Sequence, residues 1–262
     1  MNIDLKGKKA IVCGSTQGIG KAIAMAFAEA GAEIILIARN EEKLKEVKAQ
    51  LSIKDAQQHT YLMADFLKPD LLKTELEKFL KNTDKIHILV NNTGGPAPGM
   101  VTEAATADFQ EAFSKHLICH HILAQAVLPF MKKEKYGRIL NIISTSVKEP
   151  ITGLGVSNTI RAAVAAWSKT LSSENALDGI TVNNILPGYT RTGRLSSLIE
   201  QKAIKTGKSV PEVEREMMKE IPAGRFAEAD EPASLAVFLA SSYASYINGV
   251  NIQVDGGKTR SF

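Results

Sequence analysis

The glycines at positions 14, 18 and 20 constrain the fold of this chain most, because of where they lie. An apolar run, residues 10–13, comes directly before them, and an alanine-rich amphipathic stretch, residues 20–30, follows. That order predicts a buried strand, a tight turn and a helix. Glycines allow the backbone to approach a pyrophosphate, and the free amides and positive end of the helix attract its charge. We therefore expect a dinucleotide-binding turn, with a purely structural tight turn as the alternative.

The rest of the chain repeats this alternation of apolar runs and amphipathic stretches. Such repetition is typical of βαβ units, which build a parallel sheet. Strands are expected at residues 10–13, 33–38, 60–64, 86–91, 138–143, 180–186 and 250–254. Helices are expected at residues 20–30, 41–51, 69–80, 106–135, 156–177 and 231–241. The polar segment 194–220 is helical in composition and suits a mobile lid.

Composition and charge exclude several classes of protein. A chain of 262 residues with 44% hydrophobic residues and no linker-like tract fits a single domain, residues 1–262. Lysines alternate with glutamates along the presumed helices, so we expect no nucleic-acid partner. Cys13 and Cys119 lie in apolar runs without metal or disulfide spacing, and both are expected to be core thiols. The absence of a recognisable signal peptide or membrane span predicts a cytoplasmic protein with no membrane partner.

Further motifs follow the glycine turn in an order that resembles the short-chain dehydrogenase/reductase family. Asn-Asn-Thr-Gly at residues 91–94 ends the fourth expected strand, Pro187 and Gly188 follow the sixth, and residues 221–225 and 249–257 are similar to the family's C-terminal signature. The resemblance covers nearly the whole chain and points to the branch similar to 3-oxoacyl-acyl-carrier-protein reductases. It implies an α/β, three-layer doubly wound Rossmann fold with a seven-stranded parallel sheet, a helical substrate lid at about residues 191–222, and a homodimer or homotetramer.

The expected cofactor depends on the end of the second strand, where an acidic residue would bind the ribose hydroxyls of NAD(H). This chain has Arg39 and Asn40 there, and an arginine can pair with the 2′-phosphate of NADP(H). NADP(H) is therefore expected, with NAD(H) as the alternative, because Gln17 stands where many NADP-binding relatives have a basic residue. The family resemblance implies these cofactor-binding residues: Gly14, Ser15, Thr16, Gln17, Gly18, Ile19, Gly20, Arg39, Asn40, Asp65, Phe66, Asn92, Thr93, Gly94, Arg161, Pro187, Gly188 and Thr192.

The catalytic positions depart from the family pattern. The family uses a serine that positions the substrate carbonyl, a Tyr-x-x-x-Lys pair and an asparagine. Ser144 matches the serine, whereas Ser157 and Arg161 occupy the tyrosine and lysine positions, and His116 occupies that of the asparagine. A serine hydroxyl is shorter and far less acidic than a phenol, so general acid–base catalysis worth roughly 10²–10⁴ in rate is in doubt. Cofactor binding should survive this change better than catalysis.

Two functions and several proton donors stay open. The chain is expected to be an NADP(H)-dependent oxidoreductase acting on a small-molecule carbonyl or alcohol, and the alternative is a catalytically weak or inactive dinucleotide sensor or partner-binding relative. His116 has a suitable intrinsic pKa as a proton donor, but the simpler interpretation is a partly buried histidine bonded to a backbone carbonyl. Tyr189 is another candidate donor. No metal site is expected from His116 and His120, because no carboxylate or cysteine pattern completes one.

Overall fold

The computed structural model describes residues 3–261, so Met1, Asn2 and Phe262, the ends of the expected domain, lie outside the described residues. A seven-stranded, wholly parallel sheet has the order β3-β2-β1-β4-β5-β6-β7. This confirms the predicted doubly wound Rossmann fold. The strands are β1 (Lys9–Cys13), β2 (Glu33–Ala38), β3 (Thr60–Met63), β4 (Ile88–Asn91), β5 (Gly137–Ile142), β6 (Ile180–Pro187) and β7 (Asn251–Val254).

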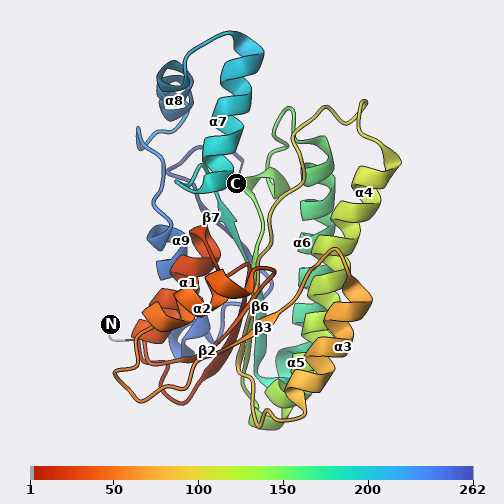
Figure 1. Ribbon diagram of the computed structural model, residues 1–262, viewed down its shortest axis with the longest axis vertical. Coiled ribbons are helices and arrows are strands. Elements are labelled where there is room, and N and C mark those ends of the chain that lie inside the picture. The colour runs from red at the N-terminus through yellow and green to blue at the C-terminus, as the bar shows by residue number, and fades with distance from the viewer. Residues whose placement is uncertain (1–2, 262) are drawn as a thin grey trace.

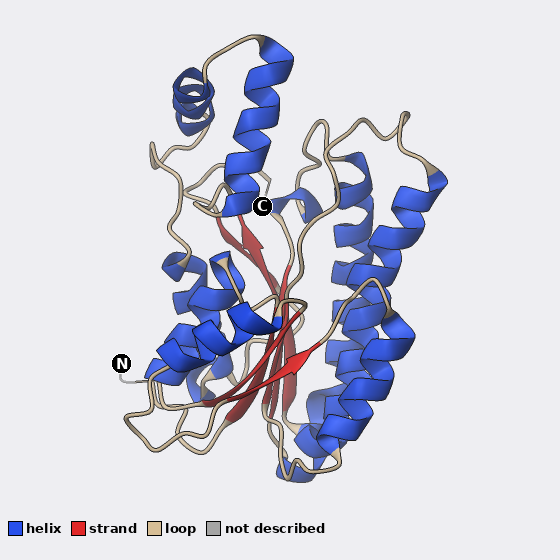
Figure 2. Ribbon diagram, viewed as in Figure 1, coloured by secondary structure: helices blue, strands red, loops and turns tan. Residues whose placement is uncertain are grey.

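Helices cover both faces of the sheet and form the two outer layers (Figures 1 and 2). One face carries α1 (Gly18–Glu29), α2 (Glu41–Gln50) and α9 (Asp230–Ala240). The other carries α3 (Pro69–Leu80), α4 (Thr106–Phe113), α5 (Cys119–Glu134) and α6 (Gly155–Asn175). Two further helices, α7 (Gly193–Thr206) and α8 (Val210–Lys219), lie beyond the end of the sheet within the segment expected to be a lid.

The central strands form because nearly every residue in them is apolar and both faces are covered. Residues 10–13 of β1 and 88–90 of β4 have no exposed surface. Two apolar clusters flank the sheet, one centred on Phe27 and Leu36 and the other on Ile11 and Leu123. Cys13 and Cys119 belong to the second cluster as buried free thiols. Continuous apolar strands of this kind are typical of parallel sheets covered by helices on both sides.

The long helix predicted at residues 106–135 is wrong in one respect, because it is interrupted. A π-helical turn, η1 (Ser114–Ile118), separates α4 from α5. Hydrophobic periodicity does not reveal one wider turn, since the apolar residues on either side still recur at helical spacing. The extra residue in that turn changes which side chains face the sheet, and His116 lies in it. The helix ends at Glu134, and Lys135 has a left-handed φ of 48°.

Four asparagines form a hydrogen-bonded row across the sheet. Asn91, Asn141, Asn184 and Asn251 are aligned in register on β4, β5, β6 and β7. The Nδ2 of Asn91 donates to Oδ1 of Asn141 at 2.8 Å, Asn141 donates to Asn184 at 2.9 Å, and Asn184 donates to Asn251 at 2.7 Å. This row therefore joins four strands through side chains as well as backbone.

Candidate active site

A cleft of about 750 Å³ opens at the carboxyl ends of the strands, where β1 lies beside β4 and the strand order reverses. Doubly wound proteins bind ligands at this position, and the volume is within the range of cofactor and substrate sites. Most predicted site residues line the cleft: Gly14, Thr16, Gln17, Gly18, Ile19, Arg39, Asn40, Asp65, Phe66, Asn92, Thr93, Gly94, Ser144, Ser157, Arg161, Pro187, Gly188 and Thr192. Ser15, Gly20 and His116 do not line it.

The glycine turn is built as the sequence predicts. Gly14 has a φ of 58°, and a Cβ there would lie 2.7 Å from Nδ2 of Asn92. Gly20 lies inside α1, where a Cβ would lie 2.3 Å from the carbonyl oxygen of Gly14, so this glycine lets the helix approach the turn. Gln17 provides no side-chain cap for α1, which leaves first-turn amides available at the cleft. An anionic ligand fits that end of the helix.

Ser15 lies beneath the turn instead of lining the cleft. Its side chain is fully buried, and both its amide and its hydroxyl donate to the carbonyl of Ile37 on β2, at 3.4 and 3.3 Å. The family resemblance placed Ser15 among the cofactor-binding residues, whereas its bonds here connect the turn to the sheet. Gly20 was also placed among the cofactor-binding residues, and it contributes here by packing closely against Gly14.

Two cations lie together where β2 ends. Arg39 and Lys43 both line the cleft and are exposed, and neither has an ion pair with another described residue. Asn40 begins α2, and its Oδ1 accepts from the amide of Lys43 at 2.9 Å. Lys43 is therefore in the first turn of a helix that starts at the cleft. The sequence analysis missed Lys43. Its position three residues after the capping Asn40 places it in the first turn of the helix, next to the cleft that Asn40 also lines.

Ser144, Ser157 and Arg161 meet at the other end of the cleft. Ser144 follows β5, and its Oγ accepts from the amide of Ser146 at 3.1 Å, which leaves its hydroxyl hydrogen free to donate. Ser157 and Arg161 lie one turn apart on α6 and are only 8% and 7% exposed. Nη1 of Arg161 donates to the carbonyl of Ile142 at 2.7 Å, while its buried Nε has no partner among the described residues. Burial, reinforced by the charge of Arg194, lowers the pKa of Arg161 to about 10, so the guanidinium stays charged at neutral pH.

His116 is buried behind the cleft. Its side chain is 1% exposed, and it contacts His120 edge to face at 6.1 Å between ring centroids. The His116 ring interacts with the backbone of Gly94, whereas His120 has no hydrogen-bond partner among residues 3–261. Burial, with the nearby charge of Arg161, lowers the pKa of His116 well below 6.5 and that of His120 to about 3. The backbone of Gly94 favours the charged form of the His116 ring, in line with the expected backbone contact, but burial outweighs this interaction and the ring is neutral near pH 7.

Tyr189 and the start of the lid complete the far wall. Tyr189 packs edge to face on Phe226 at 6.1 Å, and Nζ of Lys258 lies 5.1 Å from the centre of its ring. Burial, with the charge of Glu220, raises the pKa of Tyr189, so its phenol keeps its proton. Thr192 caps α7 through a 3.5 Å bond from the amide of Leu195.

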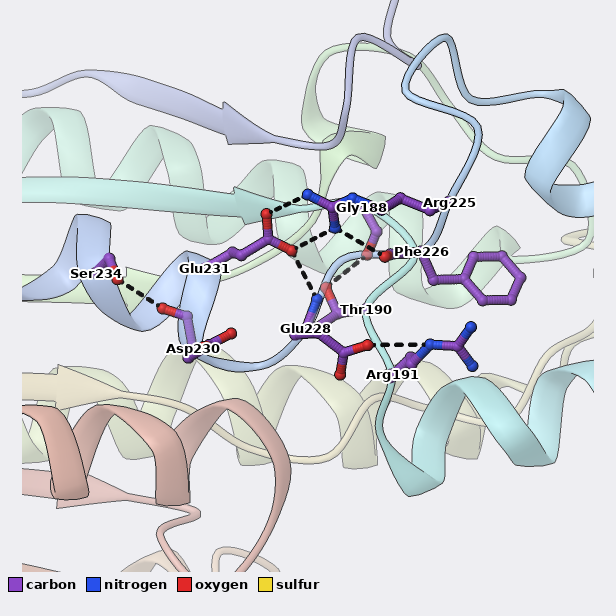
Figure 3. A network of polar contacts seen from close by, with 9 residues as sticks. All are labelled: Gly188, Thr190, Arg191, Arg225, Phe226, Glu228, Asp230, Glu231 and Ser234. Atoms are coloured by element: carbon purple, nitrogen blue, oxygen red, sulfur yellow. Dashed lines mark hydrogen bonds and ion pairs between the residues drawn. The ribbon is translucent and has the colours of Figure 1, made fainter.

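A polar network holds the base of the α7–α8 segment, which is expected to be a lid, to the body of the protein (Figure 3). Arg225 forms two bonds of 2.7 Å with the carboxylate of Glu231, and the amide of Glu228 donates to the same carboxylate at 2.8 Å. Arg191 pairs with Glu228 at 3.1 Å. Since these residues come from the segments that enter and leave the two lid helices, the network fixes both ends of the segment.

No group of three or more His, Cys, Asp or Glu residues within residues 3–261 is arranged to hold a metal ion. Over the same residues, the helices are too short or too polar to cross a membrane.

Comparison with known proteins gives a consistent result. A family model described as Enoyl-(Acyl carrier protein) reductase matches residues 14–259. The NADPH-dependent reductase BacG of Bacillus subtilis is 30% identical over 255 residues, covering 97% of this chain and 98% of that protein. The 3-oxoacyl-acyl-carrier-protein reductase FabG of Aquifex aeolicus is 31% identical over 257 residues, covering 98% of this chain and 99% of the relative.

A solved structure extends the similarity to three dimensions. The L-sorbose reductase of Gluconobacter frateurii, crystallised with NADPH and L-sorbose, superposes with a TM-score of 0.92 at 30% identity, and both chains are covered completely. These similar proteins include enzymes that are described as NADPH-dependent or contain bound NADPH, in agreement with the cofactor expected from Arg39.

Proposed function

Because this chain belongs to the short-chain dehydrogenase/reductase family, we propose that it is an NADP(H)-dependent oxidoreductase acting on a small-molecule carbonyl or alcohol with an atypical catalytic set. One observation supports this most: Ser144, Ser157 and Arg161 line the same cleft as the glycine turn and the Arg39–Lys43 pair. A site for a dinucleotide and a site for polarising an oxygen are therefore continuous.

The cleft residues fit NADP(H). The free amides at the start of α1 suit the diphosphate, and Arg39 with Lys43 suits the 2′-phosphate. Asp65 and Phe66, after β3, would border the adenine, while Pro187, Gly188 and Thr192 would border the nicotinamide and Arg161 its ribose. When bound, NADP(H) supplies or accepts the hydride.

The chain's own residues would stabilise charge on the substrate oxygen. Ser144 has a hydroxyl hydrogen free to donate, and Arg161 provides a fixed positive charge in a buried environment, where it acts more strongly than in water. Neither group titrates near pH 7, and neutral His116 lies outside the cleft. We propose that Ser144 donates to the oxyanion, that the nearby charge of Arg161 stabilises the oxyanion without direct contact, and that its proton comes from solvent. The cost is turnover slower by roughly 10²–10⁴ than with a positioned acid.

Two measurements test the proposal. Fluorescence titration should show tighter binding of NADPH than of NADH, and tighter binding of NADH would contradict the cofactor assignment. NADPH absorbance should then fall on addition of at least one member of a panel of ketones, aldehydes, quinones and 3-oxoacyl thioesters. Tight NADPH binding without turnover of any of them would favour the sensor alternative.

We also propose that the chain forms a homodimer or homotetramer through the helices of the second sheet face. Phe113 and Ile118, next to α5, are 42% and 37% exposed, and Trp167 of α6 is only partly buried. Light scattering after gel filtration should give two or four times the 28.3 kDa chain mass. A cytoplasmic location stays a prediction from the sequence.

A further inference from the structure

Two arginines converge on one glycine at the catalytic end of the cleft. The Nη2 atoms of Arg194 and Arg161 lie 3.6 and 3.7 Å from the point where a Cβ of Gly95 would be. Arg194 comes from the first turn of α7, and its Nη2 also donates to the carbonyl of Pro96 at 2.6 Å. Arg161 comes from α6 and is anchored to Ile142. Three segments far apart in sequence thus bring two guanidinium groups together.

Within residues 3–261, no carboxylate balances this pair. Asp65 is the one acidic residue among the described residues that line the cleft. It follows β3, whereas Arg161 is bonded to β5, four strand positions away in the sheet. Adjacent strands are about 4.8 Å apart, so these strands are separated by roughly 19 Å. Asp65 is therefore too far away to compensate either arginine.

The other cations of the cleft are accounted for. Lys258 pairs with Glu220 at 2.8 Å, and Lys115 pairs with Glu111 at 3.6 Å. Arg39 and Lys43 are exposed and are assigned above to the 2′-phosphate. Arg161 and Arg194 are left as buried or half-buried cations without a described ion-pair partner. Buried charges of like sign, without a counter-ion, are costly until an anion lies between them.

We propose that the substrate carries a carboxylate, which Arg194 and Arg161 bind together beside the carbonyl or alcohol that reacts. Ile143, Ile151, Leu154 and Leu198 line the same cleft and would contact an apolar remainder. Ser157 and Arg161 lie one helical turn apart on α6, and such residues have Cβ atoms about 5–6 Å apart. A carboxylate bound by Arg161 would therefore lie a few atoms from the substrate carbonyl or alcohol that faces Ser157. The substrate class is therefore an oxo acid or hydroxy acid with an apolar body. This inference rests on the proposed function.

The test compares acids with neutral isosteres on the protein saturated with NADP⁺. Benzoate and phenylacetate, with benzamide and phenylacetamide as their controls, are titrated by isothermal calorimetry. We expect the acids to bind at least about tenfold more tightly than the amides, since an amide leaves the desolvated charges of the two arginines unpaired. In Arg194→Gln, which keeps a donor for Pro96, that preference should disappear, with amide binding unchanged.

Arg191→Gln is the matched control. Arg191 is exposed, pairs with Glu228 and does not line the cleft, so this variant should keep the preference for acids. Equal binding of acids and amides to the wild-type protein, or no binding of either, would overturn the carboxylate site while leaving NADP⁺ binding intact. A tenfold loss of NADP⁺ affinity in Arg194→Gln would assign the arginine pair to the cofactor's diphosphate and also overturn it. Failure of NADP⁺ to bind the wild type would overturn the proposed function and this inference together.

Discussion

Single residues decide both the cofactor and the chemistry proposed for this chain. Arg39 could be recognised from its place after a strand, because the acidic residue expected of an NAD(H) site is missing there. Ser157 and Arg161 could be located by their spacing from Ser144. Their burial, and the charge on Arg161 that persists at neutral pH, could not be read in the same way.

Replacing Arg39 by glutamine is expected to weaken NADPH binding about fivefold to thirtyfold, because an exposed charge-assisted contact to the 2′-phosphate is lost. Lys43→Gln should have a similar effect, since Lys43 lines the same part of the cleft. NADH affinity should not change in either variant. Lys45→Gln, on the same helix but paired with Glu41 and Glu42, is the control. Fluorescence titration measures all three, and equal losses for NADPH and NADH would refute a 2′-phosphate contact.

Restoring the family's acid should raise turnover. In the double variant Ser157→Tyr with Arg161→Lys, we expect kcat to increase at least tenfold on the best substrate, with a new pH dependence from the phenol. The substitutions are made together because the two side chains act as a unit. Ser157→Phe with Arg161→Lys adds the same bulk without a hydroxyl and should give no gain. An equal gain in both variants would show that filling the cleft, and not proton transfer, was responsible.

At the scale of elements, the sequence predicts the strands well and misses how they are joined by side chains. All seven predicted strands are present with ends shifted by a residue or two, because continuous apolar runs signal buried parallel strands. The asparagine row was not foreseen, since each asparagine is an isolated polar residue in its own strand. Only the register of β4 to β7 aligns them.

Asn141→Ala is expected to lower the free energy of unfolding by roughly 2–4 kcal/mol. Asn141 bonds to Asn91, Asn184 and Ser168, and its removal leaves their buried polar atoms without partners. Asn251→Ala, at the partly exposed end of the row, removes one bond and should cost about 0.5–1.5 kcal/mol. Urea unfolding followed by circular dichroism gives both values. Similar losses in the two variants would contradict a cost set by the number of bonds lost and buried atoms left unpaired.

For the whole molecule, buried neutral histidines couple stability to pH. Burial, with the charge of Lys8, lowers the pKa of His87 to about 4, and the ring accepts from the amide of Lys9 at 3.0 Å. His116 and His120 are also held neutral by burial. An unfolded histidine titrates near 6.5, so the unfolded state binds more protons below that pH. Stability contributed by these groups is complete above pH 6.5 and is lost as the pH falls toward 4.

His87→Asn isolates one of these groups, because an asparagine oxygen can accept the same bond from Lys9. Between pH 6.5 and 4, the wild-type unfolding free energy should fall more steeply than that of the variant. The difference should approach 1.4 kcal/mol per pH unit, or about 2 kcal/mol at pH 5. Urea titrations at half-unit pH intervals measure the two slopes. If the unfolding free energies of the wild type and the variant change with pH in parallel, His87 has the same pKa in the folded and unfolded states, which would contradict this prediction.

The amino-acid sequence alone indicated the order of strands and helices along the chain and the dinucleotide turn, and it predicted which residues replace the family's tyrosine and lysine. These follow from local rules: apolar periodicity, the backbone freedom of glycine, and spacing along one chain. The charges in the lid segment at residues 194, 200, 202 and 205 indicated no substrate class, because a sequence does not say which of them faces the cleft.

The tertiary structure decides which of these charged residues faces the cleft. Of those four lid residues, Arg194 alone lines the cleft, where it meets Arg161 beside Gly95. The same packing buried His116 behind the site through a π-helical turn and left Arg161 without a counter-charge among the described residues. The energy of a charge depends on its neighbours in space and on the water that they exclude. These neighbours are 19 and 98 residues apart along the chain in the bonds of Arg161 to Ile142 and of Arg194 to Pro96, so only the folded chain defines them.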